Sequence, residues 1–265
     1  YQTIEISNPA RSNSAVGLDK KYALSGKIAF CQLYKGYWQV WGCGLNGKRL
    51  KVLTNSPIDK RYPCFSPSGD KIAYVTNTGE LWIIKSDGCY AQKITLPINC
   101  YEPKWSADAK RIVFTSYEDL FHSNSKIWIL DLETNVLNKI ANRPFLQYNP
   151  NWPPDEKNVI FVDGPELYAQ EIRKLDLNTG DVTQITDSSM FVYETQPSYL
   201  PDGEGIIYSS NQDGDYDIWI IDEIGSTPKN LTPGSSHDTS GIVSSDGQKI
   251  FFLSDRIKTN EIWQM

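Results

Sequence analysis

The feature that most constrains the fold of this 265-residue chain is an apolar pattern that occurs six times along it. The six copies are Ile28-Ala29-Phe30, Ile72-Ala73-Tyr74, Ile112-Val113-Phe114, Val159-Ile160-Phe161, Ile206-Ile207-Tyr208 and Ile250-Phe251-Phe252. Their first residues follow one another at intervals of 44, 40, 47, 47 and 44 residues, so the copies fill the sequence. Such a period indicates one structural unit per copy, each of which buries its apolar surface only against its neighbours.

A second apolar segment follows each copy, and it contains tryptophan in five of the six repeats. These segments are Val40-Trp41, Leu81-Trp82, Ile127-Trp128, Ile172-Arg173, Ile218-Trp219 and Ile262-Trp263. If the two segments of a repeat form a hairpin, Phe30 lies opposite Trp41 and Tyr74 lies opposite Trp82. We therefore predict a cross-strand aromatic pair that recurs around the structure.

Two shorter segments complete each unit. The segment that follows is Leu53-Thr54, Ile94-Thr95, Ile140-Ala141, Ile185-Thr186 or Leu231-Thr232. The segment that precedes the core is centred on Phe65, Trp105, Trp152, Tyr199 or Val243, two residues after Pro63, Pro103, Pro150, Pro197 or Gly241. Steps such as Ser68-Gly69, Asn46-Gly47 and Asp87-Gly88 favour tight turns between segments, so each unit is predicted to hold four short strands.

Four-stranded units with a period of about 40 to 50 residues are typical of a β-propeller. We predict an all-β fold, a six-bladed β-propeller of four-stranded antiparallel blades that forms a single domain over residues 1–265. One blade alone has two apolar faces and open edges, and neighbours in a ring cover those faces. The run Ile218-Trp219-Ile220-Ile221 is apolar at every position, as a strand covered on both sides requires.

The two ends of the chain are predicted to meet in the last blade. The sequence ends at Met265, after only three strands of the sixth unit, and Gln2-Thr3-Ile4-Glu5-Ile6 alternates polar and apolar residues. We predict that residues 1–7 supply the missing strand and close the ring, that residues 8–19 form a connector, and that Lys20–Leu24 is the first strand of the first blade. Because residue 1 is Tyr, we expect a processed or trimmed chain whose targeting segment lies outside it.

Composition narrows the classes of partner. The formal net charge of -6 and the absence of any basic run argue against binding to nucleic acid or to an anionic membrane. No apolar stretch approaches the roughly 18 residues that a membrane span needs. The five cysteines include no Cys-x-x-Cys spacing that resembles a zinc site, and their odd number leaves at least one unpaired. We expect buried single thiols rather than a disulfide framework, and the pairing stays open.

The repeat resembles that of the TolB propeller family. The residues that carry the resemblance are Pro63 to Tyr74, Leu81 to Gly88 and Pro197 to Asp222, and the likeness extends from about Leu24 to the C-terminus. It implies a six-bladed propeller. TolB is a periplasmic component of the Tol-Pal envelope system, and its propeller binds the peptidoglycan-associated lipoprotein. TolB also has a separate N-terminal domain, for which we expect no room here because the first repeat starts around residue 20. Similar repeats also occur in propellers of prolyl-peptidases and of sugar-acting lyases.

Motifs for catalysis or metal binding are weak. Asp213-Gly214-Asp215-Tyr216-Asp217 has carboxylates at alternate positions, but Ile218 stands where a calcium loop needs Gly, so a tight turn is the better interpretation. The sequence contains two histidines, and Ser236-His237-Asp238 are adjacent in sequence, without a Gly-x-Ser-x-Gly elbow. We therefore predict no catalytic residues, no metal site and no cofactor.

One face of the predicted propeller collects aromatic and charged residues. Connections between blades, and those between the second and third strands, emerge on this face, around the mouth of the central channel. The residues predicted to bind there are Arg61, Tyr62, Tyr101, Glu102, His122, Tyr148, Tyr193, Glu194, His237 and Asp238. Tyr, Trp and Arg are favoured at protein interfaces, although about half of these aromatics are expected to wedge between blades instead.

The leading hypothesis is a non-catalytic propeller that binds a protein or peptide partner, such as a cell-envelope lipoprotein, through this face. We expect a monomer in the periplasm or outside the cell. One alternative is a hydrolase or lyase that acts on peptide or carbohydrate, with His122, His237, Asp238 and Glu194 as acid, base or metal-binding candidates. A second alternative is a channel that binds a small ligand or a cation.

Overall fold

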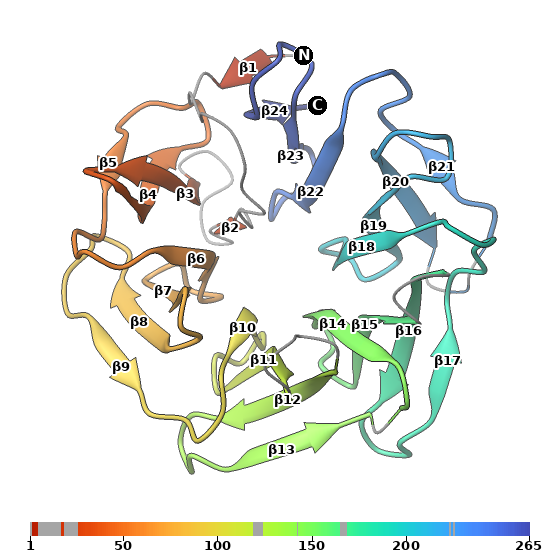
Figure 1. The fold of residues 1–265 in the computed structure, drawn as a ribbon, viewed down its shortest axis with the longest axis horizontal. Coiled ribbons are helices and arrows are strands. Elements are labelled where there is room, and N and C mark those ends of the chain that lie inside the picture. The colour runs from red at the N-terminus through yellow and green to blue at the C-terminus, as the bar shows by residue number, and fades with distance from the viewer. Residues whose placement is uncertain are drawn as a thin grey trace.

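The computed structural model describes residues 2–4, 17–18, 26–118, 124–141, 143–164, 169–222, 224 and 226–265. These residues form six four-stranded antiparallel sheets arranged around a central axis (Figure 1), and the described segments contain no helix. The predicted all-β six-bladed propeller is confirmed. Because no described segment is helical, none provides a helix that could span a membrane.

The blades follow one another in chain order, with the first strand of each blade nearest the axis (Figure 1). Blade 1 contains β2 (Gly17–Leu18), β3 (Lys27–Tyr34), β4 (Tyr37–Gly44) and β5 (Lys51–Val52), and blade 2 contains β6 (Lys60–Phe65), β7 (Lys71–Thr76), β8 (Leu81–Lys85) and β9 (Gln92–Ile94). Blade 3 contains β10 (Tyr101–Trp105), β11 (Arg111–Tyr117), β12 (Ser125–Asp131) and β13 (Leu137–Ile140). Blade 4 contains β14 (Leu146–Asn151), β15 (Asn158–Gly164), β16 (Glu171–Asp176) and β17 (Val182–Gln184). Blade 5 contains β18 (Glu194–Tyr199), β19 (Gly205–Ser210), β20 (Asp217–Asp222) and β21 (Lys229–Asn230). Blade 6 contains β22 (Asp238–Val243), β23 (Ile250–Ser254), β24 (Glu261–Gln264) and β1 (Gln2–Ile4).

The N-terminal strand closes the ring, as predicted. β1 pairs antiparallel with β24, and Thr3 lies opposite Trp263 in the register. The first strand of blade 1 differs from its prediction: the strand that pairs with β3 is Gly17–Leu18, inside the predicted connector 8–19, whereas Lys20–Leu24 lies outside the described residues. A strand of two residues is too short to produce an alternating pattern, so the sequence carries no periodic signal for it.

The predicted aromatic pairs are confirmed. Phe30 lies opposite Trp41, and Tyr74 lies opposite Trp82. The same register recurs in three other blades, as Phe114 with Trp128, Tyr208 with Trp219 and Phe252 with Trp263. In blade 4, Arg173 replaces tryptophan opposite Phe161, and its Nε lies 3.1 Å from Oδ2 of the buried Asp163.

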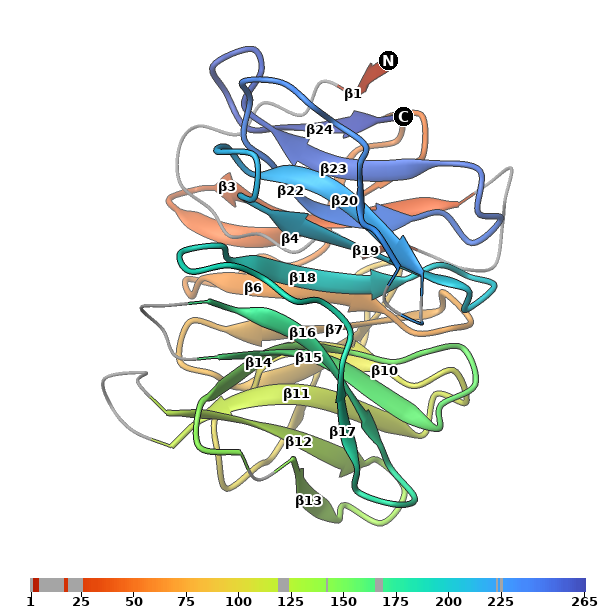
Figure 2. The same ribbon diagram turned by 90° about the vertical axis from the view of Figure 1, so that its right-hand side faces the viewer.

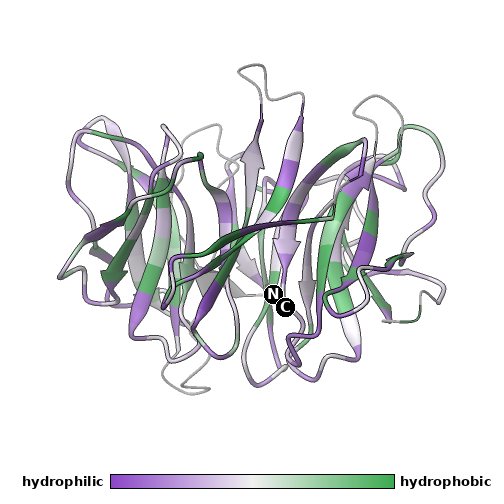
Figure 3. Cartoon of the chain, turned by 90° about the horizontal axis from the view of Figure 1, so that it is seen from below, coloured by the Kyte–Doolittle hydropathy of each residue, from purple (hydrophilic) through white to green (hydrophobic). Residues whose placement is uncertain are grey.

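The hydrophobic core lies between blades. One buried cluster joins Val40 and Leu53 of blade 1 to Phe65 and Tyr74 of blade 2, and another joins Ile28 of blade 1 to residues of blade 6. Figure 3 shows hydrophobic residues concentrated along the strands and polar residues toward their ends. Because the sixth blade packs against the first, closing the ring removes two apolar faces from water.

The cysteines are free thiols, as the sequence favoured. Cys31, Cys43 and Cys100 are buried, Cys64 is half-buried and Cys89 is exposed. Burial raises the pKa of the Cys43 thiol to about 11, so this thiol stays protonated at neutral pH.

The propeller has two different faces, visible edge-on in Figure 2. The loop face carries the connections between blades and between the second and third strands of each blade. The turn face carries the tight turns between the first and second strands and between the third and fourth. Both faces surround an end of the central channel.

Candidate functional site

A repeated backbone irregularity shapes the wall of the channel. In blades 2 to 6 the pairing of the first strand with the second shifts in register, at a β-bulge. The residue before the proline, or before Gly241, has a positive φ in every case: Tyr62 53°, Glu102 55°, Asn149 50°, Gln196 55° and Ser240 58°. Left-handed conformations are uncommon for residues other than glycine, so their recurrence marks a feature that the fold needs.

We call these five left-handed residues the axial ring, and hydrogen bonds link four of them around the axis. The backbone N–H of Asn149 donates to Glu102 Oε2 at 2.8 Å, and that of Gln196 donates to Asn149 Oδ1 at 3.0 Å. The N–H of Ser240 donates to Gln196 Oε1 at 2.9 Å. The side chains of Glu102, Asn149 and Gln196 therefore each satisfy an amide of the next blade, at the bulge.

Glu102 is the only acidic member of the axial ring. Its Oε2 accepts a second hydrogen bond from Thr115 Oγ1 at 2.8 Å. Burial raises the pKa of the Glu102 carboxyl above its ordinary value, although its hydrogen bonds and the Lys104 ammonium act in the opposite direction. Sequence reasoning assigned Glu102 and Tyr62 to the channel mouth, and the structure places both in the lining of a cavity on the axis.

The channel contains two connected cavities. The narrower cavity, of about 40 Å³, is lined by the axial ring, and we call it the ring cavity. The wider cavity, of about 350 Å³, is lined by turns of the turn face, and we call it the turn-face cavity. Four residues line both cavities: Lys104, Asn151, Ser198 and Ile242.

Sequence reasoning missed the turn-face cavity, although a signal for it was present. The residue between the proline and the aromatic in each Pro-x-aromatic motif lines this cavity: Cys64, Lys104, Asn151 and Ser198, with Ile242 at the equivalent place in blade 6. The aromatic that follows points into the packing between blades. Trp105 and Trp152 are 8% and 6% exposed, and each donates its indole N–H to the preceding blade, at the carbonyls of Cys64 and Lys104 respectively.

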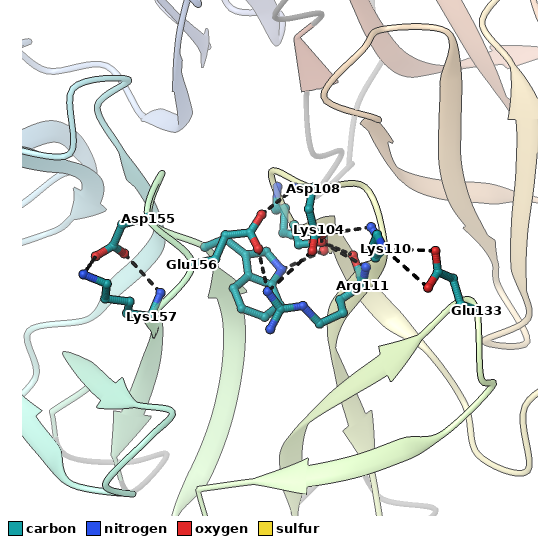
Figure 4. Close-up of polar contacts among 10 residues, drawn as sticks. Lys104, Asp108, Lys110, Arg111, Glu133, Asp155, Glu156 and Lys157 are labelled. Carbon is teal, nitrogen blue, oxygen red and sulfur yellow. Dashed lines mark hydrogen bonds and ion pairs between the residues drawn. The ribbon is translucent and has the colours of Figure 1, made fainter.

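A polar contact between blades fixes this part of the turn face (Figure 4). Arg111 Nη2 lies 2.5 Å from Glu156 Oε2, and the Glu156 carboxylate also accepts the backbone N–H of Asp108. The Arg111 guanidinium lies over the Trp152 ring, 4.8 Å from its centre. Trp152 of blade 4 also donates its indole N–H to the Lys104 carbonyl, and Lys104 pairs with Val113 within blade 3. The backbone at Lys104 is therefore held by both blades.

Two carboxylates that the sequence proposed as binding or catalytic groups belong to internal networks. Asp238 is fully buried, and its Oδ2 lies 2.7 Å from Arg256 Nη2. Glu194 is 2% exposed and accepts hydrogen bonds from Ser188 Oγ at 2.6 Å and from Thr186 Oγ1. Burial raises the pKa of Glu194 to about 7 despite these hydrogen bonds.

The other predicted residues lie at separate places on the loop face. His237 is exposed, with Nε2 3.4 Å from Asp215 Oδ1, whereas His122 lies outside the described residues. Tyr148 donates its hydroxyl hydrogen to Gln170, and the backbone N–H of Tyr193 donates to Asn211 at 2.7 Å.

Tyr101 and Arg61 complete the predicted set. Tyr101 contacts Tyr117 edge-on, with ring centres 5.1 Å apart, and Arg61 is exposed. The described members of the set therefore form several local clusters around the rim, and of these residues Tyr62 and Glu102 line the ring cavity.

Exposed large apolar side chains lie on both faces of the described structure, and more of them lie on the loop face. On the loop face they are Leu33, Tyr37, Ile58, Phe145, Met190, Phe191 and Ile257. On the turn face they are Leu50, Tyr90, Val136 and Ile224. Met190 and Phe191, each 61% exposed, are adjacent to the predicted binding residue Tyr193.

The acidic cluster of blade 5 is bound internally. The Asn230 side-chain amide donates to Asp217 Oδ2 at 2.8 Å and to Asp213 Oδ2 at 3.2 Å. Burial raises the pKa of the Asp217 carboxyl. Within the described part of the chain, no three His, Cys, Asp or Glu residues are grouped so that they could hold a metal ion.

Comparison with known proteins identifies a protein family and several solved structures with a similar fold. The model of the TolB beta propeller domain matches residues 80–265. TolB from Acinetobacter baumannii superposes with a TM-score of 0.77 at 21% identity, over 90% of this chain and 60% of that one. The putative TolB from Agrobacterium tumefaciens gives 0.73 at 20% identity, over 82% and 80% of the two chains. Oligogalacturonate lyase from Vibrio parahaemolyticus gives 0.64 at 15% identity, over 96% and 79%, and identities this low show a shared fold.

Proposed function

The chain belongs to the TolB beta propeller domain family, and from this premise we propose that it is a non-catalytic binding propeller whose loop face captures a protein or peptide partner. The observation that carries the proposal is the exposure of apolar side chains there. Met190 and Phe191 project from the connection between blades 4 and 5, and Phe145 from the connection before it. Exposed apolar groups with aromatic neighbours are what protein interfaces use.

The proposal extends to the partner and its compartment. Because the repeat resembles that of periplasmic envelope proteins, we propose a cell-envelope lipoprotein as the partner and the periplasm or the extracellular space as the compartment. The net charge of -6 is compatible with a protein partner and unfavourable for nucleic acid. We propose that the chain acts as a monomer.

The chemistry of the loop face supports binding more than catalysis. The Asp238 carboxylate is paired with Arg256, and Glu194 is enclosed by hydroxyl donors, so neither is presented to a substrate in this conformation. The fold that the chain shares with oligogalacturonate lyase supports the enzymatic alternative at the level of architecture alone.

A binding measurement with paired variants tests the proposal. The bait is the peptidoglycan-associated lipoprotein of the same organism, prepared without its lipid anchor, and its affinity is measured by biolayer interferometry. The variant Met190→Ser/Phe191→Asn removes two exposed apolar side chains, and Asn tolerates the φ of 67° at position 191. We expect the double variant to bind at least about tenfold more weakly, as the loss of interface anchors predicts.

Ile224→Ser is the matched control, because Ile224 is 91% exposed but lies on the turn face. We expect this variant to bind like the wild type. A photo-crosslinking residue at position 191 should also capture the bait, and one at position 224 should not. Equal binding by all three proteins, or crosslinking from position 224 alone, would overturn the proposed role of the loop face.

A further inference from the structure

The lining of the turn-face cavity is divided into a polar side and an apolar side. Blades 3, 4 and 5 are consecutive in the ring and contribute Lys104, Asn151 and Ser198. Blades 2 and 6 contribute Cys64 and Ile242 at the equivalent positions. At these five equivalent positions a ligand therefore meets hydrogen-bonding groups from blades 3, 4 and 5 and less polar groups from blades 2 and 6.

The polar side carries one charge. Among the described residues that line the turn-face cavity, Lys104 is the only Lys, Arg, Asp or Glu, and no ion pair joins its ammonium to another described residue. Glu102 lines only the ring cavity, where its Oε2 is already held by two donors. The Lys104 ammonium lowers the pKa of the Glu102 carboxyl from a distance but makes no direct ion pair with a described residue, so it can still pair with a negatively charged ligand in this partly enclosed cavity.

The ring cavity adds hydrogen-bond donors at the inner end. The side-chain oxygens of Asn149 and Gln196 are used by the axial ring, and the Asn149 side chain also hydrogen-bonds the Glu102 carboxyl. Within the described residues, no hydrogen bond occupies the NH₂ group of Gln196. Both residues line the same cavity as Lys104. What remains free for a ligand is thus the Gln196 NH₂ group beside the Lys104 ammonium, and N–H donors next to a positive charge suit a carboxylate.

The outer walls of the turn-face cavity are apolar. They include Pro67, Pro153, Pro154, Leu200, Pro201 and Val243, and the volume of about 350 Å³ is within the range of small-molecule sites. We propose that the turn-face cavity binds a carboxylate attached to an apolar body, with the carboxylate at Lys104, Asn151 and Ser198. The ligand is either a free small carboxylic acid or the C-terminal residue of a peptide, since both present the same chemistry.

Isothermal titration calorimetry with matched probes tests the proposal on the full chain. The small-acid pair is 3-phenylpropanoate and its primary amide, and the peptide pair is N-acetyl-Ala-Ala-Phe with a free or an amidated C-terminus. We expect at least one free carboxylate to bind at least tenfold more tightly than its own amide. Tighter binding of 3-phenylpropanoate than of the peptide acid assigns a free acid as the ligand, and the reverse order assigns a peptide C-terminus.

Variants identify the group responsible. Lys104→Met should weaken binding of the carboxylate at least tenfold and leave the amide unchanged, and Lys104→Arg should restore most of the affinity. Lys110→Met is the control, because Lys110 lies on the same face but its ammonium is 3.2 Å from Glu133 (Figure 4). If Lys104→Met does not fold, Ser198→Ala replaces it as the test, because it is a smaller change in the same wall. We expect Ser198→Ala to weaken carboxylate binding several-fold.

The test of carboxylate binding in the turn-face cavity is independent of the proposed function of the loop face. The loop-face variant Met190→Ser/Phe191→Asn should bind the carboxylate like the wild type, because its substitutions lie at the other end of the channel. Absence of binding by both free carboxylates, equal binding of acid and amide, or unchanged binding by a folded Lys104→Met protein would overturn the proposal.

Discussion

The backbone amide of Asn149 donates a hydrogen bond to the Glu102 carboxylate across the boundary between blades 3 and 4, at 2.8 Å. The same relationship continues from Asn149 to Gln196 and from Gln196 to Ser240, so it joins four consecutive blades at the axis. The bonds occur at the innermost residue of each bulge, where the sheet itself offers no acceptor. The axial ring therefore holds neighbouring blades together by backbone groups as well as by the apolar core.

Truncating Glu102 should destabilise the propeller. Glu102→Ala removes the acceptor of the Asn149 amide and of the Thr115 hydroxyl, and leaving such groups unsatisfied costs about 1–3 kcal/mol each. Glu102→Gln keeps an acceptor oxygen, so its free energy of unfolding should stay within about 1 kcal/mol of the wild-type value. Urea denaturation measures both, with the exposed Glu204→Ala as a surface control. A Glu102→Ala protein as stable as the control would show that the ring contributes nothing to stability.

Glu194 should make stability depend on pH. Burial raises the pKa of this carboxyl from 4.5 to about 7 in the folded protein, so between these values the folded state binds more protons than the unfolded state. Stability from this group is therefore present below about pH 4.5 and is lost as pH rises toward 7, by an order of about 3 kcal/mol. Glu194→Gln should remove this decrease, which urea denaturation at pH 5 and pH 8 would detect. Parallel pH profiles for the variant and the wild type would contradict the prediction.

The threonine that follows Leu53, Ile185 or Leu231 should contribute to the stability of its blade. Oγ1 of Thr54, Thr186 and Thr232 accepts the backbone N–H of Val40, Ile172 and Ile218 respectively, at 2.9 Å in each case. Thr232→Val keeps the shape but leaves the Ile218 amide without an acceptor, and we expect a loss of about 1–3 kcal/mol. Thr232→Ser should lose less, because it retains the hydroxyl. Thermal denaturation of the two variants side by side checks the order, and equal melting temperatures would contradict it.

Deleting residues 1–7 should open the ring. β1 pairs with β24 through Gln2, Thr3 and Ile4, and without it the last blade has three strands and an unpaired outer edge. We expect the melting temperature to fall by about 10 °C or more, as a loss of several kcal/mol produces in a domain of this size. Differential scanning calorimetry of the truncated and full chains measures the fall. A truncated protein that melts at the wild-type temperature would show that the clasp is dispensable.

The architecture and the pairing of strands could be predicted from the sequence, because both are encoded in short-range spacing. A period of 40 to 47 residues between copies such as Ile28 and Ile72 requires one unit per copy, and the distance from Phe30 to Trp41 sets the hairpin register. The closure by β1 followed from counting strands at the C-terminus. The extra residue at each bulge, and the two-residue β2, have no such periodic signal.

The sites depended on the closed ring. Glu102, Asn149 and Gln196 occupy the same place in their repeats, but they become hydrogen-bonded neighbours only when separate sheets converge on one axis. For the same reason Lys104 and Ser198, nearly one hundred residues apart, line one cavity. Local sequence determines how a strand pairs within its blade, whereas burial, pKa and cavity lining depend on which blades come together, and that is decided by the tertiary structure.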